Sequence, residues 1–329
     1  MDAQALFLIG FVAITTLVMC MLATGAVLWI GRLLGLVRIN LCGDVSKDWL
    51  TRHPQPKPRW TVLEFLLFFG ILLVTTSVLQ PRPAETGSPS SDSESAWTEP
   101  TEGTSESTED TTVAEAGVAK QSVASESDQK WMIATHTIAN LVAVALTISF
   151  LRLVYGATLG SLTLVPTKRD LRVGLIATPW ILVPVLGVNL VVIQFVEYEH
   201  AVTDLLADHA DPVTFCLLFM SAAVVTPLAE EFQFRLLLQG GLQQLADPPA
   251  ESGWEPRSFW PILVTSVLFA AMHLGQGAAP IPLFFLSIGL GLLYQRTGRL
   301  FPVIVVHMIL NGSTLLSEFC RVNAGIISN

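Results

Sequence analysis

The sequence predicts an all-α protein, a polytopic membrane helical bundle with about eight transmembrane helices. Of its 329 residues, 51% are hydrophobic and only 14% are charged, and the mean hydropathy is +0.57. This composition is outside the range of ordinary soluble domains. Because a helix of roughly 20 apolar residues spans the hydrocarbon core, apolar stretches of about that length predict spanning helices. We place them at 5–31, 61–80, 131–154, 173–196, 212–239, 259–274, 281–295 and 301–319.

Lysine and arginine gather in alternate loops, which indicates how the chain is oriented. Positively charged loops stay on the cytoplasmic side of a membrane. With eight helices, the three basic loops all fall on that side, and both chain ends would lie outside. We also expect an integral membrane protein, in a bacterial inner membrane. The basic residues are Arg32, Arg38, Lys47, Arg52, Lys57 and Arg59 after the first helix, Arg152, Lys168, Arg169 and Arg172 after the third, and Arg296 and Arg299 after the seventh.

The chain divides into three parts at a segment of unusual composition. Residues 81–130 are rich in Ser, Thr, Glu and Pro, and they hold most of the net charge of −9. Such a segment buries too little apolar surface to fold, so we expect a disordered acidic linker that acts as a solvated spacer. It separates two N-terminal transmembrane helices with a basic cytoplasmic loop, residues 1–80, from a six-helix unit, residues 131–329.

Basic residues also interleave with apolar ones between the third and fourth helices, in residues 159–175. The pattern is typical of an amphipathic segment on the cytoplasmic membrane surface, with its basic side toward anionic lipid. A plain connecting loop is the alternative. We find no nucleic-acid-binding signature, and the four cysteines lack the spacing of a disulfide framework or a thiolate metal site.

The stretch 227–238, PLAEEFQFRLLL, places two glutamates and an arginine inside a predicted membrane helix. Ionisable groups at membrane depth are costly, so they are functional candidates. Glu231 and Arg235 are four residues apart and can pair on one helix face. Glu230 is rotated by roughly 100° from Glu231, which leaves its carboxylate available for proton chemistry. Pro227 either begins this helical piece or kinks it.

Two later helices each carry a further polar cluster. His273 ends the run FAAMH, and His307 lies four residues before Asn311, on the same helix face. A carboxylate with a histidine can deprotonate water, while a second imidazole and an amide can donate to an oxyanion. Such a set would hydrolyse a peptide bond without a covalent intermediate. Alternatively, Glu230, His273 and His307 could ligate a divalent metal such as zinc, which activates water. These residues leave both schemes open.

Other hydrolytic signatures are missing, since the chain has no HExxH, no GxSxG and no Gly-x-Gly-Asp. In order along the chain, Glu230-Glu231-x-x-x-Arg235, Phe269-x-x-x-His273 and His307-x-x-x-Asn311 resemble the three motifs of the CPBP intramembrane protease family. That family, also called Abi, includes the type II CAAX prenyl endopeptidases and bacterial proteins tied to bacteriocin processing or immunity. The resemblance covers about 212–315.

The resemblance implies an intramembrane endopeptidase whose site opens toward the cytoplasm and cuts a membrane-anchored peptide or protein of CAAX or bacteriocin type. It implies Glu230 as the base that activates water and His273 as its partner. His307 and Asn311 would stabilise the oxyanion. Glu231 and Arg235 would hold the site together.

The family is often labelled as metalloproteases, but we expect a metal-free mechanism. Only two histidines and the acids are available as ligands, and Asn311 suits hydrogen-bond donation better than metal binding. Two other functions are alternatives: a non-catalytic membrane immunity or binding protein of the same fold, and a proton-coupled transporter that uses Glu230 and the histidines as a relay.

Overall fold

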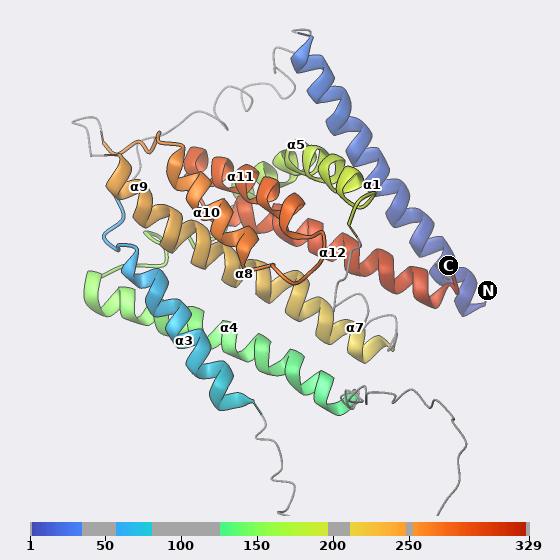
Figure 1. Ribbon diagram of the computed structural model, residues 1–329, viewed down its shortest axis with the longest axis horizontal. Coiled ribbons are helices and arrows are strands. Elements are labelled where there is room, and N and C mark those ends of the chain that lie inside the picture. Colours follow the sequence, from blue (N-terminus) through green and yellow to red (C-terminus); the bar gives the residue numbers. More distant parts are fainter. Residues whose placement is uncertain (1, 35–56, 81–125, 197–210, 248–252, 327–329) are drawn as a thin grey trace, which may run out of the picture.

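The computed structural model describes residues 2–34, 57–80, 126–196, 211–247 and 253–326. The described residues form helices and no strand, which confirms the predicted all-α bundle (Figure 1). Most of the predicted acidic linker, 81–125, lies outside the described residues. In chain order the helices are α1 (Ala3–Leu33), α3 (Leu63–Leu79), α4 (Glu126–Tyr155), α5 (Lys168–Val192), α7 (Pro212–Leu218), η1 (Phe219–Val225), α8 (Thr226–Glu231), η2 (Phe232–Gln239), α9 (Gly240–Ala246), α10 (Trp260–Ala271), α11 (Pro280–Thr297) and α12 (Phe301–Asn323).

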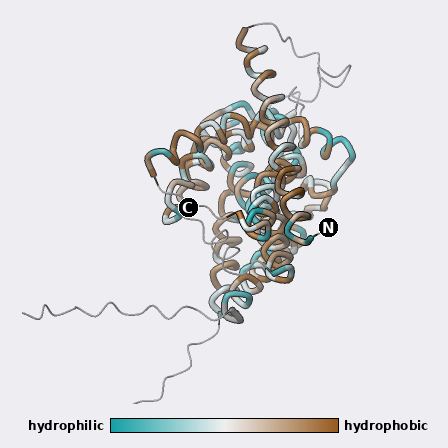
Figure 2. The backbone as a smooth tube through the Cα atoms, turned by 90° about the vertical axis from the view of Figure 1, so that its right-hand side faces the viewer, coloured by the Kyte–Doolittle hydropathy of each residue, from teal (hydrophilic) through white to brown (hydrophobic). Residues whose placement is uncertain are grey.

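Each of the eight predicted apolar stretches overlaps one or more of these helices. Five helical stretches are long and apolar enough to cross a membrane: α1, α4, α5, the rod from α7 to α9, and α12. α3 and α10 are apolar but shorter. The helices are apolar along much of their length (Figure 2), and many large apolar side chains, such as Leu17 and Val27 of α1, point outward. Soluble monomers rarely expose so much apolar surface, and lipid accounts for it here.

The first motif lies on a continuous helical rod, residues 212–246, that runs through the middle of the bundle between α3 and α4 on one side and α10 to α12 on the other (Figure 1). Two segments of the rod, η1 and η2, are π-helical, with hydrogen bonds from residue i to i+5. They flank α8, which carries both glutamates. π-Helical turns are rare and occur mostly at functional sites, because the extra residue changes the direction of neighbouring side chains.

Both N-terminal helices pack directly on the rest of the bundle. α1 lies against α5 and α12, and the indole Nε1 of Trp29 donates to the carbonyl oxygen of Trp180 at 3.0 Å. That carbonyl needs an outside donor because Pro184, four residues later, has no N–H. α3 packs on α4 and η2, and Trp60, just before α3, donates to the carbonyl oxygen of Leu236 at 2.9 Å. The helical rod that carries the first motif is thus held partly by α3 and Trp60.

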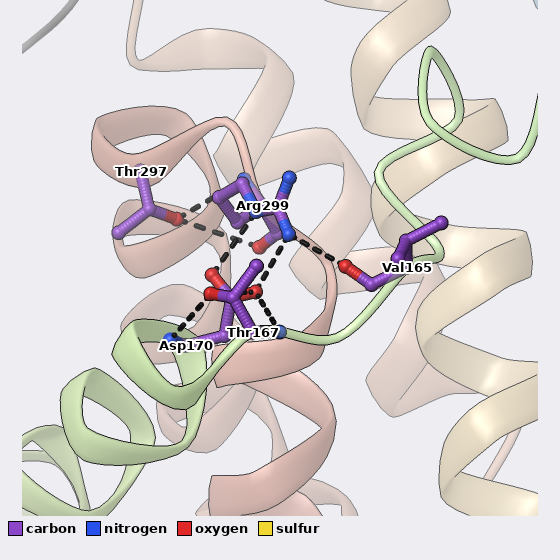
Figure 3. A network of polar contacts seen from close by, with 5 residues as sticks. All are labelled: Val165, Thr167, Asp170, Thr297 and Arg299. Carbon is purple, nitrogen blue, oxygen red and sulfur yellow. Dashed lines mark hydrogen bonds and ion pairs between the residues drawn. The ribbon is translucent and has the colours of Figure 1, made fainter.

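A polar network joins the start of α5 to the turn between α11 and α12 (Figure 3). Thr167 and Asp170 form a capping box at the α5 N-terminus. Arg299 donates to both carboxylate oxygens of Asp170, at 3.0 and 2.6 Å, and to the carbonyl oxygen of Val165 at 2.7 Å. A bidentate pair of this kind is strong and geometrically specific. It fixes the end of α12 from which His307 is positioned.

The predicted surface segment 159–175 is divided between two structures. Residues 156–167 form turns and irregular backbone, whereas Lys168, Arg169 and Arg172 belong to the exposed first turns of α5. The first half of the segment is therefore a connecting loop, which was the alternative interpretation, and it forms no amphipathic helix. The three basic side chains remain exposed at one end of the bundle, where they can face lipid headgroups.

Candidate active site

Three helices bring the predicted site residues together. Glu230 and Glu231 end α8, His273 lies two residues after the end of α10, and His307 lies on α12, about two turns from its start. At 1.5 Å of rise per residue, His307 lies about 9 Å along α12 from the α11–α12 turn. His273 lies about 20 Å from the start of α10 by the same rise. The cluster is therefore inside the bundle rather than at its end.

Glu231 is the centre of a fully buried ion pair. Its Oε2 accepts from Nε of Arg235 at 2.8 Å, as the i, i+4 spacing predicts, and its Oε1 contacts Nδ1 of His307 at 2.8 Å. Both side chains of the pair are 0% exposed. Arg235 also donates from Nη1 to Ser287 of α11 at 2.9 Å, and its guanidinium carbon lies 5.4 Å from the ring centroid of Phe269. Buried charges need such partners, so Glu231 is held in place.

Glu230 is in a different position, with 21% of its side chain exposed. Its Oε1 lies 4.0 Å from Nε2 of His273, and its Oε2 lies 3.7 Å from Nε2 of His307. Both distances are longer than a direct hydrogen bond. The two adjacent glutamates thus differ as their rotation about the helix predicts. Glu231 is paired with Arg235, whereas the carboxylate of Glu230 is available to bind another molecule.

The hydrogen bonds of the two histidines fix where their protons lie. Nδ1 of His273 is 2.8 Å from the carbonyl oxygen of Phe269, and Nδ1 of His307 is 2.8 Å from the carboxylate of Glu231. Because both partners only accept, each Nδ1 carries a proton, and in the neutral ring Nε2 is an acceptor. Two Nε2 atoms and the Glu230 carboxylate therefore converge as hydrogen-bond acceptors. A water molecule, with two protons to donate, suits this arrangement.

Carboxylate and imidazole groups are also ligands for metal ions such as zinc. Within the described ranges, no group of three or more His, Cys, Asp or Glu side chains is arranged to hold a metal ion. The alternative in which Glu230, His273 and His307 ligate a metal stays a prediction, and we derive no step through a metal.

Asn311 lies on α12, one turn after His307, and its Nδ2 donates to the carbonyl oxygen of Ala222 in η1 at 2.9 Å. The i to i+5 pattern of η1 would pair this carbonyl with residue 227, but Pro227 has no N–H. The amide of Asn311 replaces the missing donor. The contact of Asn311 with the oxyanion stays a prediction. The second proton of the Asn311 amide is available for that contact.

Two side chains of the site carry no role in the sequence-based prediction. The fully buried ring of Phe269 lies 5.0 Å from the ring of His273 and 6.1 Å from that of His307, centroid to centroid. Its place at the start of the FxxxH motif could have indicated this. Ser287, the hydroxyl partner of Arg235, stands alone in the apolar run LFFLSIGLG and gives no signal.

Fold and site together define an all-α integral membrane protein with a buried carboxylate and histidine site. Residues 212–313 match the family described as Type II CAAX prenyl endopeptidase Rce1-like. The match contains all three motifs, confirms the resemblance predicted from them, and supports an intramembrane endopeptidase in general. The rest of the chain lies outside the match. Neither a curated protein nor a solved structure matches the chain.

Proposed function

We propose that this protein is an intramembrane endopeptidase in which Glu230 activates water to cut a membrane-anchored peptide or protein. One observation carries the proposal: the carboxylate of Glu230 and the Nε2 atoms of His273 and His307 converge across 3.7 to 4.0 Å. A water between these acceptors would donate one proton to the carboxylate and the other to a histidine. Its oxygen lone pairs would then be free to attack a carbonyl carbon.

The reaction balances with the groups at hand. The water oxygen forms a bond to the carbonyl carbon while Glu230 takes its proton. The negative oxygen of the tetrahedral intermediate is stabilised by hydrogen-bond donors, for which Asn311 and His307 are the candidates. His307 donates from Nε2 only as an imidazolium, so in this scheme it carries both ring protons before the reaction starts, and the attacking water is held by Glu230 and His273. Glu231 would neutralise that imidazolium through the 2.8 Å contact at Nδ1. The carbon–nitrogen bond then breaks as Glu230 returns the proton to the leaving amine, with His273 as its partner.

The surroundings of Glu230 favour a lipid-anchored substrate. Met272 and Leu274 flank His273 and are 55% and 74% exposed. Such apolar residues at membrane depth would face lipid, so a substrate with a lipid anchor or a membrane helix can approach from that side. By helical rise, His307 and His273 lie about 10–20 Å from the end of the bundle at the α11–α12 turn. An extended peptide of three to six residues spans that distance. We propose a cut close to the membrane surface, with CAAX-type or bacteriocin-type peptides as the substrate class and the site open to the cytoplasm.

The proposal is tested by comparing the termini of membrane proteins in cells that carry the wild type, Glu230→Gln or Glu318→Gln. Glu318 is a matched control because it is a partly buried glutamate paired with Arg321, away from the site. We expect termini that disappear with Glu230→Gln and persist with Glu318→Gln. Purified proteins are then given synthetic CAAX peptides with and without a prenyl group, which tests the substrate class. Identical termini in all three strains, with all proteins folded in the membrane, would overturn the proposal.

A further inference from the structure

A stripe of buried polar residues continues along the rod beyond the ion pair. Glu231, Arg235, Gln239 and Gln243 follow one another at intervals of four residues, and none is more than 1% exposed. The apolar residues between them pack into the core or against the aromatic rings of the site. Buried polar groups inside a membrane protein are costly unless they are hydrogen bonded. Four of them in a row therefore need a physical explanation.

The π-helical segment keeps these four residues on one side of the rod. In an α-helix of 3.6 residues per turn, a step of four residues overshoots a full turn, so a longer series drifts around the helix. In a segment with i to i+5 bonds the turn is wider, and a step of four falls short of it. The series of four residues crosses both α-helical and π-helical backbone. The overshoot in the α-helical part and the shortfall in the π-helical part have opposite directions, so they offset each other.

Each residue beyond Glu231 has a polar atom that the protein leaves unsatisfied. Among the described residues, Nη2 of Arg235, Oε1 of Gln239 and Nε2 of Gln243 have no hydrogen-bond partner. The other end of the Gln239 amide is fixed, because its Nε2 donates to the carbonyl oxygen of Gly291 at 2.9 Å. Native proteins satisfy such atoms with buried water. The stripe is thus a series of buried donors and acceptors for which the described residues supply no partner.

The stripe ends in a small pocket at the α11–α12 end of the bundle. Gln243 lines it together with Trp60, Trp254, Tyr294 and Thr163. Thr163 adds a second unsatisfied atom, its buried Oγ1, and has a left-handed backbone with φ of 55°. The pocket encloses about 50 Å³, and one water needs about 10–15 Å³. It can hold more than one water at the mouth of the stripe.

We propose that the stripe is a water path that leads from this pocket to the buried site. Water would pass from Gln243 to Gln239 and Arg235, and from there to the side of Glu231 and His307 that faces Glu230. Hydrolysis consumes one water for each bond cut, and the exposed, apolar Met272 and Leu274 flank His273, a neighbour of Glu230. The use of the water rests on the proposed function, but the path itself can be tested without any activity.

The path is tested with thiols and silver ion, a small probe that reaches thiols through water. Gln239→Cys and Gln243→Cys are made in a chain whose four native cysteines are replaced by alanine. Leu237→Cys is the matched control, since Leu237 is on the same π segment, fully buried, and packed in the apolar core. The fraction of blocked thiol is read by alkylation and mass spectrometry after unfolding. We expect reaction at least about tenfold faster at 239 and 243 than at 237. Equal protection at all three positions would overturn the proposal.

A measurement on the unaltered chain guards against variants that do not fold. Hydroxyl radicals made from ordered water by X-rays label the side chains beside that water. We expect labelling of Tyr294, which is 7% exposed at the pocket, and none of Phe68, which is 0% exposed in the apolar core. Equal labelling of the two rings would contradict the path.

A third measurement connects the path to catalysis. Gln239→Leu removes the polar atoms at similar size, so we expect turnover to fall at least about tenfold with KM little changed. If Glu230→Gln leaves hydrolysis intact, the proposed function fails while the thiol result still decides the path. If Gln239→Leu turns over normally, the path does not supply the reaction.

Discussion

Replacing Arg235 with methionine gives the sharpest test of how the site is held. The side chain is 0% exposed, and it bonds Glu231 at 2.8 Å and Ser287 at 2.9 Å. Methionine fills similar volume without a charge. The variant therefore leaves the Glu231 carboxylate buried with His307 as its remaining partner.

The expected magnitude follows from that burial. Breaking a buried ion pair from one side costs about 3–5 kcal/mol, because the remaining charge is uncompensated. Removing both charges leaves no such charge, so the double variant Arg235→Met with Glu231→Gln should lose about 2–3 kcal/mol less than the sum of the two single variants. Arg321→Met is the control. Its pair with Glu318 is partly exposed, at 24% and 18%, and such a pair contributes about 0–1 kcal/mol.

The assay is the midpoint of unfolding of purified protein in detergent, measured by thermal and denaturant titration for the wild type and the four variants. We expect Arg235→Met to lower stability far more than Arg321→Met, and the double variant to recover part of the loss. If Arg235→Met is no more destabilising than Arg321→Met, or if the two substitutions simply add, the ion pair does not hold the site and the reasoning fails.

Three further predictions follow from the same contacts. Asn311→Ala should destabilise by about 1–3 kcal/mol, because the carbonyl oxygen of Ala222 loses its donor. The penalty should shrink when Pro227→Ala restores a backbone N–H, and an unchanged penalty in that double variant would contradict the account. Ser287→Ala should cost about 1.5–3 kcal/mol, the worth of a hydrogen bond to a charged group, as measured by the shift in unfolding midpoint; no shift would mean that Arg235 does not need the hydroxyl. Hydrolysis by purified protein should persist after dialysis against a chelator, and activity that vanishes and returns with added zinc would overturn the metal-free scheme.

The sequence predicts well whatever depends on local spacing. Long apolar stretches identify the helices because a membrane span needs about 20 apolar residues. The interval of four residues predicts the pairing of Glu231 with Arg235, and adjacency predicts that Glu230 points elsewhere. The meeting of His273 and His307 at Glu230 was expected only from the resemblance, since no local rule brings α10 and α12 to α8.

Features that depend on tertiary packing could not be predicted. The two π segments have no sequence signature apart from Pro227. A helical projection with 3.6 residues per turn therefore does not predict that Gln239 and Gln243 align with the ion pair. The donation from Asn311 to Ala222 joins residues 89 apart. The contacts of Trp29 and Trp60 with later helices likewise span 151 and 176 residues.

Hydrolysis at a buried site in a membrane requires an apolar, lipid-anchored peptide and polar water to reach the same catalytic group. A lipid-anchored peptide is soluble in the hydrocarbon, and the exposed Met272 and Leu274 beside His273 give it an apolar approach. Water is scarce there, so it needs a polar route, which the fully buried stripe through Gln239 and Gln243 would provide. If both routes exist, widening the lipid side should change which peptides are cut, whereas closing the polar side should slow every peptide by the same factor. A loss at Gln239→Leu that varied from peptide to peptide would mean that this residue contacts substrate instead of water.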